Sequence, residues 1–103
     1  MKIFAIVDNH DTLMGLRLAG IEGVIVENGG DASAALEKAA EDNDIGMIFM
    51  TSTSSSMAIN SVNAIRLQKS QPLIVEIPDR HVKQGDINKA LSQYVQQAIG
   101  AKL

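Results

Sequence analysis

Four short apolar runs, separated by stretches with helical periodicity, limit the possible folds of this chain more than any other feature. Their apolar residues are nearly continuous and do not alternate with polar ones. Strands that are buried on both faces of a parallel sheet have this pattern. We therefore predict four buried parallel strands, at Lys2–Val7, Val24–Glu27, Gly46–Met50 and Leu73–Ile77.

The segments between and after these runs predict helices. One spans about Asp11 to Leu18, and Asp31 is placed to cap a second helix with an alanine-rich stripe from Ala32 to Ala40. Ser54 or Ser55, within a hydroxyl-rich loop at 51–56, is placed to cap a third. The last helix follows Asp86 and carries an unbroken apolar stripe: Ile87, Ala90, Leu91, Tyr94, Val95, Ala98 and Ile99. Met14, Met47, Met50 and Met57 are interpreted as core residues.

The order strand–helix, repeated four times, predicts an α/β fold because crossovers between parallel strands are right-handed. We expect a doubly wound sheet of order 2-1-3-4, flavodoxin-like, receiver-like and Rossmann-type, with flanking helices. The 103 residues suit one structural domain. Within it we distinguish an α/β core at 1–77, a tether at 78–85, and a C-terminal helix and tail at 86–103.

Composition excludes several classes of function. Only 3% of residues are aromatic and the net charge is −3, which argues against nucleic-acid binding by base stacking or phosphate contacts. The chain has no cysteine, hence no disulfide, no thiolate nucleophile and no cysteine-based zinc site. No apolar run approaches the roughly 18 residues of a membrane span. We expect a cytoplasmic protein without direct membrane insertion.

A doubly wound sheet binds ligands where its strand order reverses, beyond the carboxyl ends of the first and third strands. That edge offers polar side chains but lacks the glycine motif of a dinucleotide site. A phospho-receiver needs an aspartate at the end of the third strand, where this chain has Thr51 and Ser52. Helix capping explains the first-turn acids better than metal binding does. We expect no catalytic residue, cofactor or metal among Asp8, Asn9, His10, Asp11, Thr51 and Ser52.

The last predicted helix has features of a partner-binding element. Its face away from the apolar stripe is nearly uncharged, with Gln93, Gln96 and Gln97 beside a single lysine, Lys89. Exposed helix faces usually carry more charge. The long tether before it, together with this neutral face, favours packing against a helix of another protein.

The segment DTLMGLRLAGI at 11–21 directly follows a predicted strand and an acidic turn. It resembles the signature of the F subunit of the vacuolar and archaeal-type (V-type and A-type) rotary ATPases. DIGMIFMT at 44–51 is similar to the family's third strand, PLIVEIP at 72–78 to its fourth, and Ala98-Ile99-Gly100 to its closing helix. Ser52 is a departure, since many members have an acidic residue there.

The resemblance implies a noncatalytic subunit of the central stalk rather than an enzyme. The F subunit binds the helical hairpin of the D subunit and, through it, acts with the catalytic hexamer and the membrane rotor. It thereby helps to couple ATP hydrolysis or synthesis to proton or sodium transport, in the cytoplasm at the membrane periphery. The residues placed for the contact are Ile77, Arg80, Ile87, Leu91, Tyr94, Val95 and Ile99.

Two alternatives remain at this point. One is a stand-alone receiver-like signalling or phosphotransfer domain, against which the missing strand-three aspartate argues. The other is a small nucleotide-binding module at the position where the strand order reverses.

Overall fold

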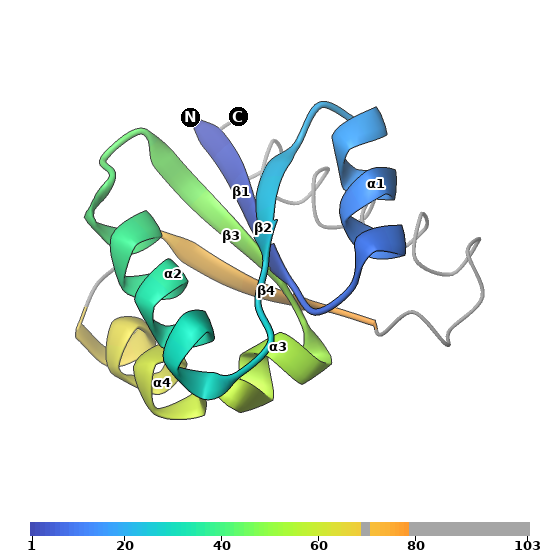
Figure 1. Cartoon of the computed structure of the whole chain (residues 1–103). Helices are drawn as coiled ribbons and strands as arrows, with labels where there is room; N and C mark the ends of the chain where they lie inside the picture. The colour runs from blue at the N-terminus through green and yellow to red at the C-terminus, as the bar shows by residue number, and fades with distance from the viewer. Residues whose placement is uncertain (69–70, 79–103) are drawn as a thin grey trace.

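Four parallel strands form a single sheet of order β2-β1-β3-β4 in the computed structural model, which describes residues 1–68 and 71–78 (Figure 1). This confirms the predicted fold and strand order. The elements in chain order are β1 Lys2–Val7, α1 His10–Leu18, β2 Glu22–Ile25, α2 Gly29–Glu41, β3 Ile45–Thr51, α3 Ser52–Met57, α4 Ile59–Gln68 and β4 Leu73–Ile77.

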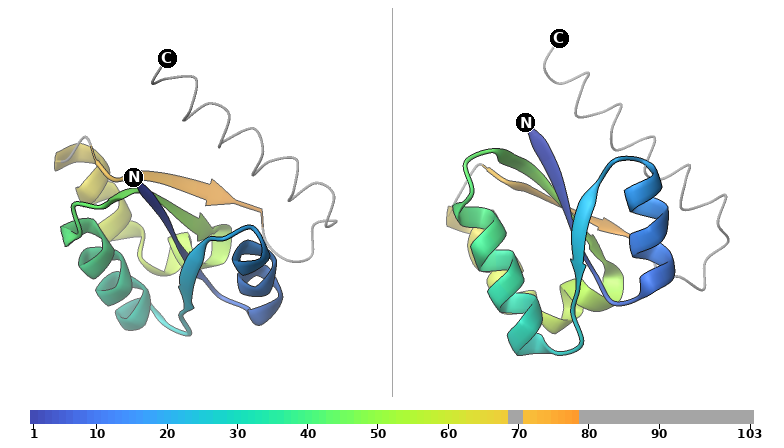
Figure 2. Two further views of the ribbon diagram at one scale, coloured as in Figure 1. Left: turned by 90° about the horizontal axis from the view of Figure 1, so that it is seen from above. Right: turned by 45° about the horizontal axis from the view of Figure 1, so that its top comes forward.

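Helices lie on both faces of this sheet, as a doubly wound fold requires. Helix α1 packs on β1 and β2 and is the one helix on its face within the described residues (Figure 2). Helices α2 and α4 pack on the opposite face, and α3 lies at the carboxyl ends of β1, β3 and β4. We call these the α1 face and the α2 face.

Each face has its own apolar cluster, because successive strand side chains point to opposite sides. Ile6, Ile48 and Met50 point to the α2 face, whereas Ala5, Val7 and Phe49 point to the α1 face. The alanine stripe of α2 packs as expected, with Ala32 and Leu36 fully buried. Among the methionines, Met47 and Met50 are core residues, but Met14 is 55% exposed, so its assignment to the core was wrong.

Strand β2 starts two residues earlier than expected. It spans Glu22–Ile25 instead of 24–27, because its pairing with β1 begins at the Phe4–Glu22 pair. Gly23 makes this approach possible, since a Cβ atom there would lie 2.7 Å from the carbonyl oxygen of Ala5. The pairing continues beyond the strand, where the Val26 amide donates to the Val7 carbonyl at 2.8 Å.

Asparagines cap the first two helices. Asn9 Oδ1 accepts from the Thr12 amide at 2.8 Å, and Asn28 Oδ1 accepts from the Asp31 amide at 2.9 Å. The expected cap at Asp31 was therefore wrong, and its carboxylate lies in the first turn of α2. Helix α1 begins one residue before the predicted start and is followed by Gly20, whose φ of 85° favours glycine.

The serine-rich segment, expected as a loop, is helical. Thr51 caps α3, which spans Ser52–Met57 and ends at Ala58 before α4 begins. The predicted cap at Ser54 or Ser55 was wrong, because both side chains are buried inside the helix. The Ser54 hydroxyl lies 2.7 Å from the Ile6 carbonyl oxygen and accepts from Thr51 Oγ1 at 3.0 Å. A buried serine in this segment is stable because its hydrogen bonds are satisfied.

Candidate functional site

The carboxyl edge of β1 holds the first group of candidate residues, and their geometry is that of a capped helix. Asn9 is buried, and its side-chain amide donates to Asp8 Oδ1 at 3.2 Å while its Oδ1 caps α1. His10 and Asp11 lie exposed in the first helical turn. The arrangement stabilises the amino end of α1, since carboxylates and amide oxygens there offset unpaired backbone amides.

Thr51 and Ser52, at the end of β3, hold elements together. Thr51 is fully buried and caps α3. Ser52 Oγ donates to the backbone carbonyl of Ile77 at 3.3 Å, which joins the start of α3 to the last residue of β4. The position that would carry the phosphoryl-accepting aspartate of a receiver therefore contributes a helix cap and a hydrogen bond from α3 to β4.

Within residues 1–68 and 71–78, no group of three or more His, Asp or Glu side chains converges on a point where a metal ion could be held. Over the same residues, no helix has the length and hydropathy to cross a bilayer.

Strand β4 presents a different kind of candidate surface. Leu73, Val75 and Ile77 alternate onto the α1 face, where Val75 and Ile77 join the cluster around Phe49. Leu73 at the start of this row is 54% exposed, while Ile77 at its end is 1% exposed. Helix α1 packs on β1 and β2, at the other side of this face. The apolar row on β4 is thus distant from the one described helix of its own face.

The structure brings one predicted contact residue, Ile77, to the end of this row. The other six lie outside the described residues: Arg80, Ile87, Leu91, Tyr94, Val95 and Ile99. The expected tether and C-terminal helix lie there too, apart from Pro78. Sequence reasoning overlooked Leu73 and Val75, although alternation around Ile74 and Glu76 in LIVEI could have identified them.

The chain matches a known family over nearly its whole length. The family profile described as ATP synthase (F/14-kDa) subunit aligns with residues 3–95. The A-type ATP synthase F subunit of Methanococcus aeolicus is 36% identical over 107 residues, covering 100% of this chain and 99% of the relative. The protein of the same name from Methanocaldococcus jannaschii is 31% identical over 104 residues, covering 100% and 99%.

A solved structure agrees at the level of the fold. The V-type ATP synthase F subunit of Archaeoglobus fulgidus superposes with a TM-score of 0.60 at 22% identity, covering 74% of this chain and 96% of the other. The two archaeal relatives match this chain from end to end, and both carry the same name. This chain belongs to the F-subunit family of the A-type and V-type ATP synthases.

Proposed function

We propose that this chain is a noncatalytic central-stalk subunit that binds the helical hairpin of the D subunit. Membership of the F-subunit family is the observation that carries this proposal. In this role the chain acts at the membrane periphery on the cytoplasmic side. Through the D subunit it helps to couple ATP hydrolysis or synthesis in the catalytic hexamer to proton or sodium transport by the membrane rotor.

The carboxyl end of β4 supports a contact that starts at Ile77. Ser52 fixes the Ile77 carbonyl from α3, so the chain leaves the sheet at a defined point beside the apolar β4 row. Residues 86–103 follow a tether of eight residues. An apolar helix stripe delivered to this edge is suited to pack against a long helical hairpin.

The proposed contact consists of an apolar stripe with two anchors. The stripe residues are Ile87, Leu91, Val95 and Ile99. Tyr94 and Arg80 are the anchors, because Tyr and Arg contribute disproportionately to interface energy. A torque-bearing contact favours such an apolar centre with a buried aromatic or arginine side chain.

Co-expression with the D subunit of the same rotary ATPase tests the proposal. Size-exclusion chromatography and native mass spectrometry are expected to give a one-to-one complex. Tyr94→Ala is expected to weaken it by about 2 kcal/mol or more, as loss of a hot-spot residue does. Gln96→Ala is the matched control, because it alters the neutral face of the same segment and is expected to leave the affinity unchanged.

Removal of residues 86–103 is expected to abolish the complex, provided that circular dichroism and thermal melting show a folded core. A folded full-length chain that forms no complex with the D subunit would overturn the stalk role. Unchanged affinity of a folded Tyr94→Ala variant would place the contact elsewhere on the chain.

A further inference from the structure

The connection between β2 and α2 carries Asn28-Gly29, the one Asn-Gly pair of the chain. Asn28 is exposed and caps α2. Asparagine is among the residues that degrade chemically, because the backbone nitrogen of the next residue can attack the side-chain amide. A following glycine makes this attack easiest, since it has no Cβ atom to hinder the approach. The pair therefore combines a reactive sequence with an exposed position.

The position of Gly29 in the helix leaves its backbone nitrogen available for this attack. Gly29 is the first residue of α2, and the amides of a first helical turn have no acceptor within the helix. Asn28 Oδ1 accepts instead from the Asp31 amide, at 2.9 Å. The backbone of Asn28 is extended, with φ −150° and ψ 173°. The Gly29 nitrogen is thus next to the Asn28 side chain and outside the hydrogen bonds of the helix.

The packing of α2 on α3 explains why a glycine follows Asn28. A Cβ atom at position 29 would lie 3.0 Å from the carbonyl oxygen of Met57, the last residue of α3. This is shorter than an ordinary van der Waals contact, so a larger residue would push the two helices apart. At position 30 the nearest atom would be Asn28 Oδ1, at 3.3 Å, which belongs to a side chain. The fold thus requires glycine at 29 for space, and the reactive pair is a consequence.

We propose that Asn28 is a site of spontaneous deamidation, which converts the cap of α2 to aspartate and isoaspartate as the protein ages. The Gly29 nitrogen gives its proton to the solvent and forms a bond to Asn28 Cγ. The Cγ–Nδ2 bond breaks, and the leaving group takes a proton from the solvent and departs as ammonia. Water then opens the succinimide ring that results. Cleavage of the new bond to Cγ gives aspartate, and cleavage of the original peptide bond gives isoaspartate. This proposal is independent of the proposed function.

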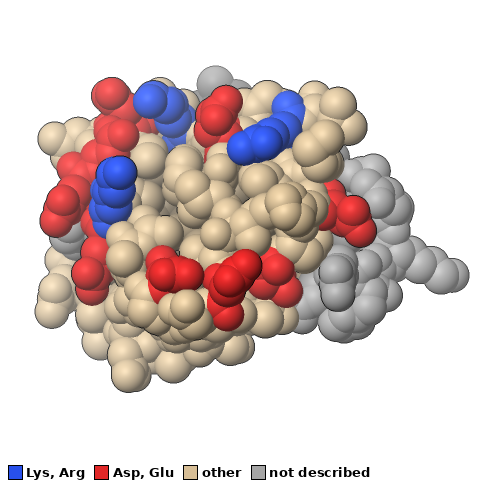
Figure 3. All heavy atoms as spheres, viewed as in Figure 1, with Lys and Arg blue, Asp and Glu red and all other residues tan. Residues whose placement is uncertain are grey.

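The two products have different effects on α2. Aspartate keeps a cap, since its carboxylate accepts from the Asp31 amide as Asn28 does. It loses the bond that Asn28 Nδ2 donates to Asp31 Oδ2 at 3.2 Å. Isoaspartate adds a methylene group to the backbone, so the cap is lost and the chain between Val26 and α2 changes its path. Both products add a negative charge, and Figure 3 shows acidic side chains already gathered toward the α2 side of the view.

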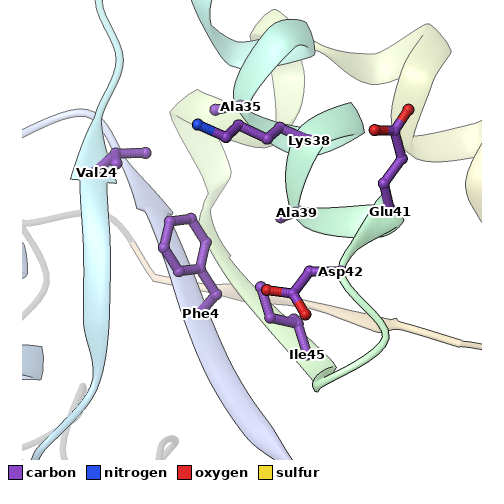
Figure 4. Close-up of a pocket in the computed structure, with 8 residues that line it drawn as sticks. All are labelled: Phe4, Val24, Ala35, Lys38, Ala39, Glu41, Asp42 and Ile45. Carbon is purple, nitrogen blue, oxygen red and sulfur yellow. The ribbon is translucent and has the colours of Figure 1, made fainter.

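Loss of the cap acts on the end of α2 that holds the helix most closely to the rest of the fold. Ala32 and Leu36, in the first two turns, are fully buried in the cluster of the α2 face. Nearer the carboxyl end, Ala35 and Ala39 line a space of about 500 Å³ that separates α2 from Val24 of β2 (Figure 4). Fraying that starts at position 28 therefore reaches the buried part of the helix first.

The test is incubation of the full-length chain at mildly alkaline pH, followed by anion exchange and tandem mass spectrometry of peptides. Asn28 is expected to gain the mass of aspartate or isoaspartate before any other asparagine does. Asn9 is the internal control, because it caps α1 through the Thr12 amide but is buried and precedes His10. Asn9 is expected to react at least about tenfold more slowly than Asn28. Equal rates at the two caps would overturn the proposal.

A pair of matched variants tests the role of Gly29. Gly29→Ala is expected to slow the reaction at Asn28 by about tenfold or more, because the added Cβ hinders the attacking nitrogen. Gly30→Ala leaves the Asn-Gly pair intact and is expected to react at the rate of the parent chain. Thermal melting checks that both variants are folded, since position 29 lies close to Met57. Equal rates in the two folded variants would contradict the proposal.

A third variant separates the effect of the structure from that of the pair itself. Ala64→Gly creates a second exposed Asn-Gly pair, at 63–64 within α4. The amide at position 64 is hydrogen-bonded within the helix, since it donates to the carbonyl four residues earlier. This pair is therefore expected to react at least about tenfold more slowly than Asn28. Equal rates at the two pairs would show that the first turn of α2 does not promote the reaction.

Thermal melting tests the effect of the modification on α2. Asn28→Asp stands in for the aspartate product and is expected to melt close to the parent chain, because it keeps a cap. Protein enriched in isoaspartate at position 28 is expected to melt about 4–8 °C lower, as loss of one cap in a domain of this size does. If the isoaspartate form melted with Asn28→Asp, deamidation would not release the cap, and this part of the proposal would be wrong.

Discussion

The two faces of the sheet are organised differently within the described residues. On the α2 face, helices α2 and α4 pack against β1, β3 and β4, and α3 closes the carboxyl edge. On the α1 face, α1 packs on β1 and β2, and the apolar side chains of β4 lie beyond it. Helix packing on the α2 face thus extends to β4 through α4, whereas the described helix of the α1 face packs on β1 and β2.

Exposure also differs between the central and the edge strands of the sheet. A sheet side chain that a helix of the same chain covers contributes to folding through burial. Apolar positions on the edge strands, such as Val24 on β2 and Leu73 on β4, are 37% and 54% exposed. The edge strands therefore keep partly exposed apolar side chains, whereas the central strand β3 is buried throughout.

Core truncation on each face gives the largest expected effect. Phe49→Ala on the α1 face is expected to lower the free energy of unfolding by about 3–5 kcal/mol, because a fully buried ring leaves a cavity. Leu36→Ala on the α2 face is expected to lower it by about 2–5 kcal/mol. Urea denaturation measures both values.

The two truncations also sharpen the contrast between the faces. Phe49 contacts the cluster that includes Val75 and Ile77, so its truncation is expected to reduce affinity for the D subunit as well. Leu36→Ala is expected to leave that affinity unchanged at a temperature where both variants are folded. If Leu36→Ala weakened binding as much as Phe49→Ala, the β4 side would lose its special role.

The buried hydroxyl of Ser54 is the next strongest test, because it ties α3 to β1 at the edge between the faces. Ser54→Ala removes the hydroxyl that donates to the Ile6 carbonyl and accepts from Thr51 Oγ1, at an expected cost of about 1–3 kcal/mol. Ser56→Ala, on the exposed side of α3, is expected to stay within about 0.5 kcal/mol of the parent. Thermal unfolding compares them, and similar melting temperatures would contradict a structural role for the buried serine.

Removal of the N-terminal cap compares how much α1 and α2 each depend on capping for stability. Asn28→Ala is expected to cost about 1 kcal/mol through loss of the bond to the Asp31 amide. Asn9→Ala is expected to cost at least as much, since Asn9 is buried and also bonds Asp8. Chemical denaturation provides both numbers. A larger loss for Asn28 would show that α2 depends more on its cap than α1 does.

Substitution of exposed leucines is expected to change stability least. Leu18 and Leu67 are both 87% exposed, on α1 and α4 respectively. Leu18→Ser and Leu67→Ser are each expected to change stability by less than about 0.5 kcal/mol. Neither is expected to alter binding of the D subunit. A marked loss of affinity in one of them would extend the proposed interface beyond the β4 side.

The sequence alone determined the strands, the helical periodicity and the parallel order, because buried strands and amphipathic helices impose distinct spacings of apolar residues. It also carried the family resemblance, which the relatives confirm. A cap at the start of α1 was also predicted, since capping depends on neighbours in the chain, although the sequence analysis gave it to the acidic residues and the structure gives it to Asn9. Such features depend on residues that are close together in the sequence, so the sequence pattern alone predicts them.

Tertiary structure decided what depends on residues far apart in sequence. Ser54 could be recognised as a buried helix residue only once β1 placed the Ile6 carbonyl beside it, 48 positions away. The start of β2 depended on its register with β1, and Gly23 mattered because Ala5 approaches it. A space of about 500 Å³ between Val24 of β2 and Ala39 of α2 arises from two elements that each look ordinary in sequence. Space and hydrogen-bond partners are properties of the assembled chain, so periodicity could not predict them.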